Sequence, residues 1–236
     1  CGFDQVFKKV GMEPTGDPFN SLMKLENTDS SPYNPMINAG AIVVASCLAS
    51  EISFDTMLDT IRALCMDPDI NLDKKVYHSE MSHISRNRAI AYLLESKGYI
   101  EKNKDVENSL HFYVKMCSLS VTAESLAGLG LILANDGIHP DTGKRLLSSQ
   151  AVKIVKTLMF TCGMYDGSGE FAVRVGIPSK SGVGGGILSV VDGEMGIGIF
   201  GPALDKKGNS VAGECVLEYM SHELHLHMFD PQRHTL

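Results

Sequence analysis

The chain has 236 residues, of which 44% are hydrophobic, and its formal net charge is −7 at pH 7. This length and composition allow a sizeable core in one domain or in two closely packed subdomains. The acidic balance argues against nucleic acid and anionic membrane surfaces as main partners. Six scattered cysteines include no C-x-x-C pair, which favours reduced buried thiols over a disulfide framework. With no signal peptide in the sequence, we expect a cytoplasmic globular protein.

The first half of the chain carries start signals for several helices. Asn34 before Pro35 is a strong N-terminal signal and predicts a helix over about 35–50. Its many small residues make it thin, so we expect it at the centre of a helical cluster. Ser53 is expected to cap the next helix. A further helical region is predicted from Ser79 to a stop at Gly98.

The second half changes from helices to strands. Helices are predicted at about 105–117, 122–135 and 148–160, and Phe171 to Val175 alternates as a strand would. Two antiparallel strands, about 180–190 and 194–200, flank a tight turn at Asp192-Gly193. An amphipathic helix over Val211 to Leu226 is expected to lie on this sheet. The predicted fold class is α+β: a helical subdomain at about 30–160, and a sheet with a covering C-terminal helix at about 165–236.

The segment Lys180-Ser181-Gly182 opens the first of these strands and suggests a ligand site. A lysine followed by small residues lets a cation and backbone N–H groups face a ligand, and Gly182 and Gly184 to Gly186 would allow close approach. The alternative is a glycine-rich hairpin that only admits a packed helix. Just upstream, Tyr165 on a loop is a candidate proton shuttle or hydroxyl donor, or simply a half-buried ring.

Four residues of the helical region are further candidates for binding. Glu80 suits a ligand's ammonium group, and Asn87 and Asn38 suit a carboxylate or an amide. Because Glu80 and Asn87 are seven residues apart, one continuous helix would place both on nearly one face, about 10 Å apart along its axis. Tyr113 carries the same ambiguity as Tyr165. For each of them, a solvated side chain, a local cap or a packed ring is the alternative.

Two other motifs are weaker. His222 to His227 lacks the H-E-x-x-H spacing of a zincin, so we expect a surface helix end and no metal. Ser21 to Lys24 matches S-x-x-K, but the local pattern is extended, which gives the wrong geometry for a catalytic pair.

Several sequence blocks together closely resemble the serine-dependent glutaminase family, in order and over essentially the whole chain. The blocks are Asn34–Ile42, Ser79-Glu80 with Arg86-Asn87, Phe112-Tyr113, Cys162–Asp166 and Lys180–Val183, supported by Gly11–Gly16 and Leu204–Ser210. The resemblance implies a β-lactamase/transpeptidase-like fold, no cofactor, a homodimer or homotetramer, and hydrolysis of L-glutamine to L-glutamate and ammonia through a serine acyl-enzyme.

The resemblance also implies roles for individual residues. The positions that match the glutamine-binding residues are Asn38, Glu80, Asn87, Tyr113 and Tyr165. Val183 matches the residue whose backbone N–H serves the oxyanion site, Tyr165 the tyrosine beside the reacting serine, and Lys180 the lysine of the K-T-G motif of the wider fold.

One departure from the family pattern concerns the start of the chain. The resemblance places the S-x-x-K nucleophile, another binding tyrosine and the first strands of the sheet upstream of the segment that matches Cys1 to Phe19. We therefore expect an N-terminally truncated glutaminase domain over residues 1–236 that binds glutamine poorly and does not turn it over. The alternatives are a non-catalytic relative that binds amino acids, and another acyl-serine hydrolase of the same fold, such as a β-lactamase.

Overall fold

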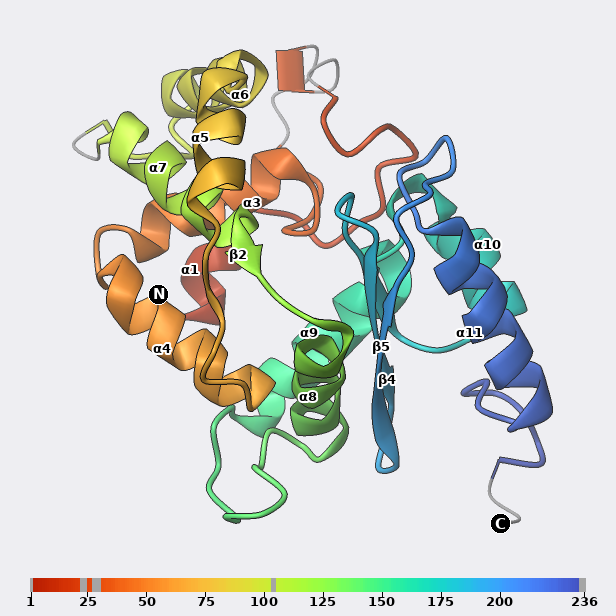
Figure 1. Cartoon of the computed structure of the whole chain (residues 1–236). Helices are drawn as coiled ribbons and strands as arrows, with labels where there is room; N and C mark the ends of the chain where they lie inside the picture. The colour runs from red at the N-terminus through yellow and green to blue at the C-terminus, as the bar shows by residue number, and fades with distance from the viewer. Residues whose placement is uncertain (1, 22–24, 27–30, 103–104, 234–236) are drawn as a thin grey trace. The chain divides into compact units, whose positions relative to one another are not determined.

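A computed structural model describes residues 2–21, 25–26, 31–102 and 105–233. Their contacts divide the chain into two compact units (Figure 1). Unit 1 comprises Cys1–Ile61 and Asp69–Ser120, and unit 2 comprises Arg62–Pro68 and Val121–Leu236. This division differs from the predicted subdomains, because the helices predicted at about 122–135 and 148–160 belong to the unit that contains the three-stranded sheet.

Unit 1 is mainly helical. Its helices are α1 (Phe3–Phe7), α3 (Asn38–Leu48), α4 (Phe54–Cys65, whose last residues belong to unit 2), α5 (Lys74–Ser82), α6 (Ser85–Ser96) and α7 (Val106–Cys117). Two short antiparallel strands, β1 (Asn71–Leu72) and β2 (Leu119–Ser120), pair with each other. The core lies where α3, α6 and α7 pack together, and Ile42, Ile90 and Leu110 are fully buried in it. The thin helix is therefore central to its cluster, as predicted.

Two predicted helix boundaries in unit 1 are wrong. Asn34 begins a turn and not a helix: its Oδ1 accepts a hydrogen bond from Met36 N at 3.0 Å, and α3 starts only at Asn38. The helical region predicted from Ser79 to Gly98 is two helices, since α5 begins after its N-cap Asp73 and ends at His83. Glu80 is therefore on α5 and Asn87 on α6, so the spacing along one continuous helix does not apply to this pair.

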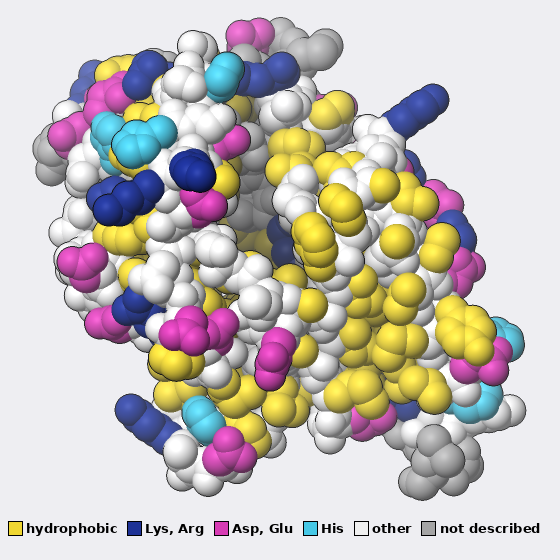
Figure 2. All heavy atoms as spheres, viewed as in Figure 1, with side chains coloured by type: hydrophobic (Ala, Val, Ile, Leu, Met, Phe, Trp, Pro, Cys, Tyr) yellow, Lys and Arg dark blue, Asp and Glu magenta, His cyan; other side chains and the backbone are white. Residues whose placement is uncertain are grey.

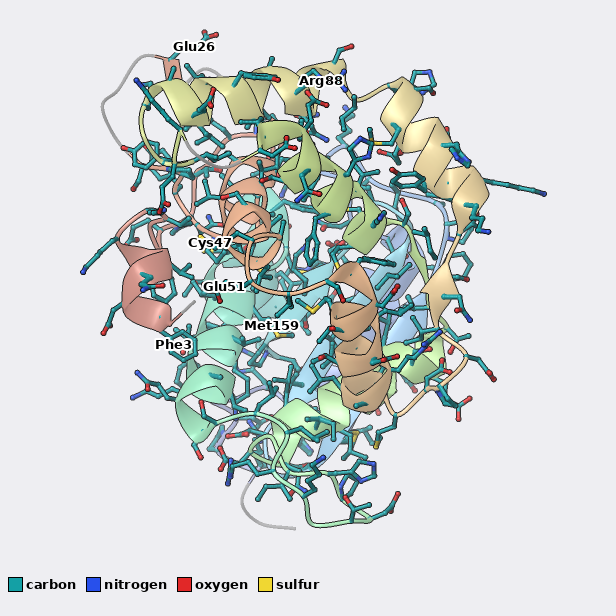
Figure 3. All side chains as sticks on the ribbon, turned by 90° about the vertical axis from the view of Figure 1, so that its left-hand side faces the viewer. Phe3, Glu26, Cys47, Glu51, Arg88 and Met159 are labelled. Carbon is teal, nitrogen blue, oxygen red and sulfur yellow. The ribbon has the colours of Figure 1, made fainter. Side chains whose placement is uncertain are left out.

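The two helices that α3 contacts are also tied to each other. Arg88, labelled on α6 in Figure 3, donates to both carboxylate oxygens of Glu107 on α7, at 2.8 and 3.0 Å. This hydrogen-bonded pair holds the pKa of the Glu107 carboxyl below its usual value. The side chains of both residues are about 40% exposed, which limits the contribution of the pair to stability because solvent screens it.

Unit 2 combines helices with a three-stranded sheet. Its elements are α8 (Ala123–Ala134), α9 (Ser149–Cys162), the 3-10 helix η1 (Tyr165–Gly167), α10 (Ser168–Arg174), β3 (Ser179–Ser181), β4 (Gly186–Val191), β5 (Met195–Phe200) and α11 (Val211–Glu223). The predicted N-caps Thr122 and Ser148 are confirmed, since each side chain accepts a backbone N–H of the first turn. Phe171 to Val175, predicted as a strand, lies mostly within α10, so that prediction is wrong.

The sheet has the order β3-β4-β5 and is antiparallel throughout. The strand predicted at about 180–190 is in fact two strands, β3 and β4, joined by the turn Gly182–Gly185, and Lys180 pairs with Leu188. The Asp192-Gly193 turn joins β4 to β5 as predicted, with Gly193 at a φ of 74°.

Helices cover both faces of this sheet (Figure 1). On one face α8 approaches β5 backbone to backbone: a Cβ at Gly198 would lie 1.8 Å from the carbonyl oxygen of Ala123. On the other face Leu217 of α11 packs into a core with Ile187 and Ile197. The C-terminal helix thus lies on the sheet as predicted, and the glycines of β5 serve helix packing.

Part of the hydrophobic surface of unit 2 is exposed. Figure 2 shows hydrophobic side chains gathered over β5 and α11, where Phe200 and Tyr219 are 63% and 68% exposed. Within the described residues, Cys47, Cys65 and Cys162 are buried and Cys117 and Cys215 are exposed. Burial and the charge of Asp67 raise the pKa of Cys65 to about 11. None of the described helices has both the length and the apolar composition needed to cross a membrane.

Candidate active site

In unit 1 the structure brings two of the predicted binding residues into direct contact. Asn38 Nδ2, in the first turn of α3, donates to Asn87 Oδ1 on α6 at 2.9 Å. The Asn38 backbone N–H also donates to the Phe19 carbonyl at 3.1 Å, and Arg86 Nε donates to the Asn20 carbonyl at 2.8 Å. The amide pair is therefore held by two helices and the turn at residues 19–20. Its remaining groups, Asn38 Oδ1 and Asn87 Nδ2, make no hydrogen bond to a described residue and suit a polar ligand.

Glu80 and Tyr113 lie on two neighbouring helices of unit 1. Glu80 is exposed near the end of α5, and Tyr113 is half-buried on α7, where it packs against the unit's core. The two helices are joined by a hydrogen bond of 2.6 Å between Tyr77 Oη and His111 Nδ1. The part that Glu80 and Tyr113 play in binding stays a prediction.

In unit 2 Tyr165 occupies a strained turn. It follows the end of α9 and has a φ of 55°, in the left-handed region that few non-glycine residues adopt. The turn lies directly against β3: Ser181 N donates to the Gly163 carbonyl at 3.0 Å, and a Cβ at Gly163 would lie 1.8 Å from the Ser179 carbonyl oxygen. Only glycine at 163 allows this approach, which sets the distance between Tyr165 and the lysine strand.

Lys180 and Tyr165 are in contact. The Lys180 Nζ lies 4.4 Å from the centroid of the Tyr165 ring, a cation–π geometry, and it also donates a hydrogen bond to the Ser181 carbonyl. Two residues that the sequence analysis selected from separate motifs are therefore brought together by the contact between the α9–η1 turn and β3.

Val183 lies at the tip of the turn between β3 and β4. Gly182 N donates to Gly186 O and Gly185 N donates to Gly182 O, both at 2.9 Å, so these two bonds close the turn. Val183 is 52% exposed, and its N–H has no acceptor among the described residues. A backbone donor left unused on an ordered turn suits an incoming oxyanion. The glycine-rich stretch is explained here by the turn itself, with Gly185 at a φ of 94°.

Sequence reasoning missed two buried polar residues that hold the backbone at Tyr165. The Ser168 Oγ and the Asn209 Nδ2 both bond to backbone groups of Met164 or Tyr165, and both side chains are almost fully buried. Asn209 belongs to the block Leu204–Ser210, which the sequence analysis singled out only for its resemblance. Residue type alone does not distinguish a buried polar side chain from an exposed one, so the sequence gives no local signal for the burial of Ser168 and Asn209.

Ser21–Lys24 and His222–His227, the two weaker motifs of the sequence, provide no candidate site within the described residues. In Ser21–Lys24, residues 22–24 lie outside the described residues, so the geometry of this pair is not seen. His222 and His225 instead bond to neighbouring carboxylates, Glu223 and Asp230. Over the described ranges, no three His, Cys, Asp or Glu side chains are grouped as metal ligands would be.

Comparison with known proteins gives a consistent result. A family model described as Glutaminase matches residues 1–229. The chain is 53% identical over 232 residues to a glutaminase of Fusobacterium nucleatum, covering 97% of this chain and 75% of that protein. It is also 53% identical over 231 residues to a glutaminase of Clostridioides difficile, covering 96% of this chain and 74% of that one.

Solved structures agree with the sequence relatives. The crystal structure of a probable glutaminase of Bacillus subtilis superposes with a TM-score of 0.91 at 40% identity, covering 97% of this chain and 77% of that one. A second structure is a covalent complex between a Bacillus subtilis glutaminase and 5-oxo-L-norleucine, formed with 6-diazo-5-oxo-L-norleucine. It superposes with a TM-score of 0.84 at 37% identity, covering 97% of this chain and 75% of that one.

Proposed function

The chain belongs to the glutaminase family, and on that basis we propose that it carries substrate-binding and catalytic residues for hydrolysis of L-glutamine to L-glutamate and ammonia. The observation that carries the proposal is the match of the family model to residues 1–229. The contacts within each unit supply its chemical content: a pair of amides in unit 1, and a tyrosine, a lysine and an unused backbone donor in unit 2.

The unit 1 residues suit the amino-acid head of glutamine. At pH 7 the ligand presents an ammonium group and a carboxylate on one carbon. The Glu80 carboxylate is the acceptor proposed for the ammonium, while the Asn87 amide and the Tyr113 hydroxyl are the proposed donors to the carboxylate. A ligand without this head would leave these polar groups without the proposed partners, which would weaken its binding and give the specificity.

The unit 2 residues suit the chemistry at the side-chain amide. A serine Oγ attacks the amide carbonyl carbon, the C–N bond breaks as the nitrogen takes up a proton and leaves as ammonia, and water then hydrolyses the acyl ester to glutamate. The Val183 N–H is proposed to donate to the oxyanion that forms at each step, and Tyr165 to transfer protons near the reacting atoms.

The covalent complex of the Bacillus subtilis relative supports this assignment. Its ligand keeps the α-amino acid head of glutamine and carries a keto group where glutamine has its amide carbonyl, and it is bound covalently in that protein. We extend the same substrate class to this chain.

The test is release of ammonia and glutamate from L-glutamine by the full gene product that contains this sequence. Hydrolysis of glutamine, with L-asparagine and nitrocefin much poorer substrates, is the expected result. Nitrocefin hydrolysis with glutamine inert would overturn the proposal in favour of a β-lactamase-like enzyme. Glutamine binding in a calorimeter without ammonia release would indicate an amino-acid-binding relative. The 236-residue chain alone, assayed in parallel, tests whether these residues suffice.

We also propose that the protein self-associates. The support is the exposed apolar surface of unit 2, where Phe200, Val216 and Tyr219 are all more than 40% exposed (Figure 2). Sedimentation of the gene product should give more than the monomer mass, and Tyr219→Lys should lower it. An unchanged mass in that variant would exclude this surface as the interface.

A further inference from the structure

The backbone at Tyr165 is held against its own preference. A left-handed φ, here 55°, is unfavourable at a non-glycine residue and persists only when surrounding contacts enforce it. The side chains of Ser168 and Asn209 both bond to the backbone at this turn, alongside the backbone bond from Gly167 N to the Met164 carbonyl at 3.0 Å. Both side chains bond to backbone groups of Met164 or Tyr165, and neither is assigned a contact with substrate or with the Tyr165 hydroxyl.

Ser168 bridges the two sides of the strained residue. Its Oγ accepts from Met164 N at 3.0 Å and donates to the Tyr165 carbonyl at 2.8 Å. The side chain is 2% exposed, so water does not compete for either bond. One hydroxyl thus fixes the N–H before Tyr165 and the carbonyl after its Cα, which together define the turn.

Asn209 fixes the preceding peptide from another part of the chain. Its Nδ2 donates to the Met164 carbonyl at 3.3 Å, across 45 positions in sequence. The loop that carries it is itself rigid, because Asp205 Oδ1 accepts from the backbone N–H groups of Lys207 and Asn209 at 2.9 and 2.8 Å. A second link joins the same loop to α10, where Lys207 Nζ bonds to Glu170 at 3.1 Å.

Asn209 makes this contact at a cost. The residue is fully buried, and its Oδ1 has no hydrogen-bond partner among the described residues. A buried acceptor without a partner is unfavourable, so an asparagine kept only for stability would be a poor choice at this position. The observation that favours a positioning role is the bond of the buried Asn209 Nδ2 to the Met164 carbonyl, directly before Tyr165.

We propose that Ser168 and Asn209 are positioning residues that lock Tyr165 in its left-handed conformation, with the phenol ring beside Lys180. This inference rests on the proposed function, since it assigns the purpose of the lock to the reaction in which Tyr165 transfers protons. The two residues act through the backbone of Met164 and Tyr165 and do not touch substrate.

The experiment compares Ser168→Ala and Asn209→Ala with Ser221→Ala in the full gene product. Ser221 is a matched control, because its Oγ is also buried and donates to a backbone carbonyl, that of Val175, at 2.6 Å. The two positioning variants should lower kcat for glutamine by about tenfold to 10²-fold, as expected for a misplaced catalytic group, with KM little changed. Ser221→Ala should lose a similar amount of thermal stability and keep its kcat.

Two further readouts separate positioning from simple destabilisation. Introduced into the Tyr165→Phe protein, Ser168→Ala should lower kcat no further, because the group that it positions is already gone. In protein labelled with 3-fluorotyrosine, the ¹⁹F signal of Tyr165 is the one that is lost in Tyr165→Phe. This signal should shift in Ser168→Ala and Asn209→Ala, and it should keep its position in Ser221→Ala.

The possible results are decisive in both directions. Wild-type kcat in both positioning variants, additive losses with Tyr165→Phe, or an unmoved ¹⁹F signal would overturn the inference. A gene product inactive on glutamine would overturn the proposed function instead, and the ¹⁹F spectra would still decide whether Ser168 and Asn209 hold the tyrosine.

Discussion

The two units hold their candidate site residues by different means. In unit 1, Asn38 and Asn87 sit on regular helices and pair through their side chains. In unit 2, Tyr165 and Val183 sit on turns, one with a strained backbone and one with an unused N–H, and the surrounding strands and buried polar groups hold them. Side chains on regular helices suit recognition of the bound ligand. A turn can leave backbone N–H groups unpaired and directed at the reacting atoms, whereas helices and sheets use these groups in their own hydrogen bonds. We therefore expect unit 1 changes to act mainly on KM and unit 2 changes mainly on kcat.

The largest expected effect belongs to Tyr165. Tyr165→Phe removes the hydroxyl and keeps the ring against Lys180, so the fold should be preserved. Loss of a general acid–base group lowers rates by about 10²–10⁴-fold, and we expect kcat for glutamine to fall within that range with KM little changed. Steady-state kinetics checks this, and a variant with more than half of the wild-type kcat would remove Tyr165 from the chemistry.

Val183→Pro tests the backbone donor in the same unit. The side chain is 52% exposed and the φ of Val183 is not positive, so proline removes the N–H without removing a hydrogen bond of the described fold. Losing one oxyanion donor should lower kcat by about 10²–10³-fold. Val183→Ala is the control, because it keeps the N–H and should keep the rate. Equal losses in both variants would mean that the side chain matters instead.

A third prediction compares the stability effect of changing a glycine that allows α8 to pack on β5 with that of changing a glycine in the β3–β4 turn. Gly198→Ala places a Cβ where the Ala123 carbonyl lies and forces α8 away from β5, at an expected cost of about 3 kcal/mol in the free energy of unfolding. Gly184→Ala, at the turn, meets nothing within 4 Å and should change stability by less than about 0.5 kcal/mol. Urea denaturation measures both, and similar values would refute the distinction.

Asn87→Ala tests the recognition side of the comparison. It leaves Asn38 Nδ2 without its partner and removes a proposed donor to the substrate. Loss of such polar pairing corresponds to about 1–3 kcal/mol, so KM for glutamine should rise by about tenfold to 10²-fold while kcat changes little. A large drop in kcat at constant KM would break the division between the units.

The smallest expected effect concerns the ion pair between Arg88 on α6 and Glu107 on α7. The Arg88 guanidinium lowers the pKa of Glu107, so the carboxylate stabilises the fold above its unfolded pKa and this stability is lost as the pH falls through the lower folded value. Glu107→Gln should lower Tm slightly at pH 7, and the difference from wild type should vanish in acid. A difference that does not shrink as the pH falls below the usual carboxyl range would contradict the linkage.

The sequence predicted most of the helix starts because capping is a local signal. Asp105, Thr122 and Ser148 each accept a backbone N–H three residues on, and the prediction needed no tertiary information. The misses have equally specific reasons. Over five residues from Phe171, helical and strand periodicities cannot be distinguished. At the break at His83, the side chains of Ser82 and His83 bond to the carbonyl of Ser79 and so compete with the backbone bonds of the helix. No glycine or proline marks this break in the sequence.

Residue patterns alone made Lys180, Tyr165 and the polar residues of the helical region candidates, whereas Val183 and the individual roles came from the family resemblance. Nothing local in Cys162–Asp166 predicts that Tyr165 adopts a left-handed φ, since that conformation depends on Ser168 and on Asn209 from a distant loop. The pairing of Asn38 with Asn87 likewise depends on how α3 packs against α6.

The exposed thiols have a practical consequence. Cys117 ends α7 in unit 1 and Cys215 lies on α11 in unit 2, whereas Cys47, Cys65 and Cys162 are shielded from reagents. Once Cys1 is replaced by serine, maleimide dyes or spin labels should attach at one point on each unit without any introduced cysteine. Probes at those two positions would then report on each unit separately when glutamine is added.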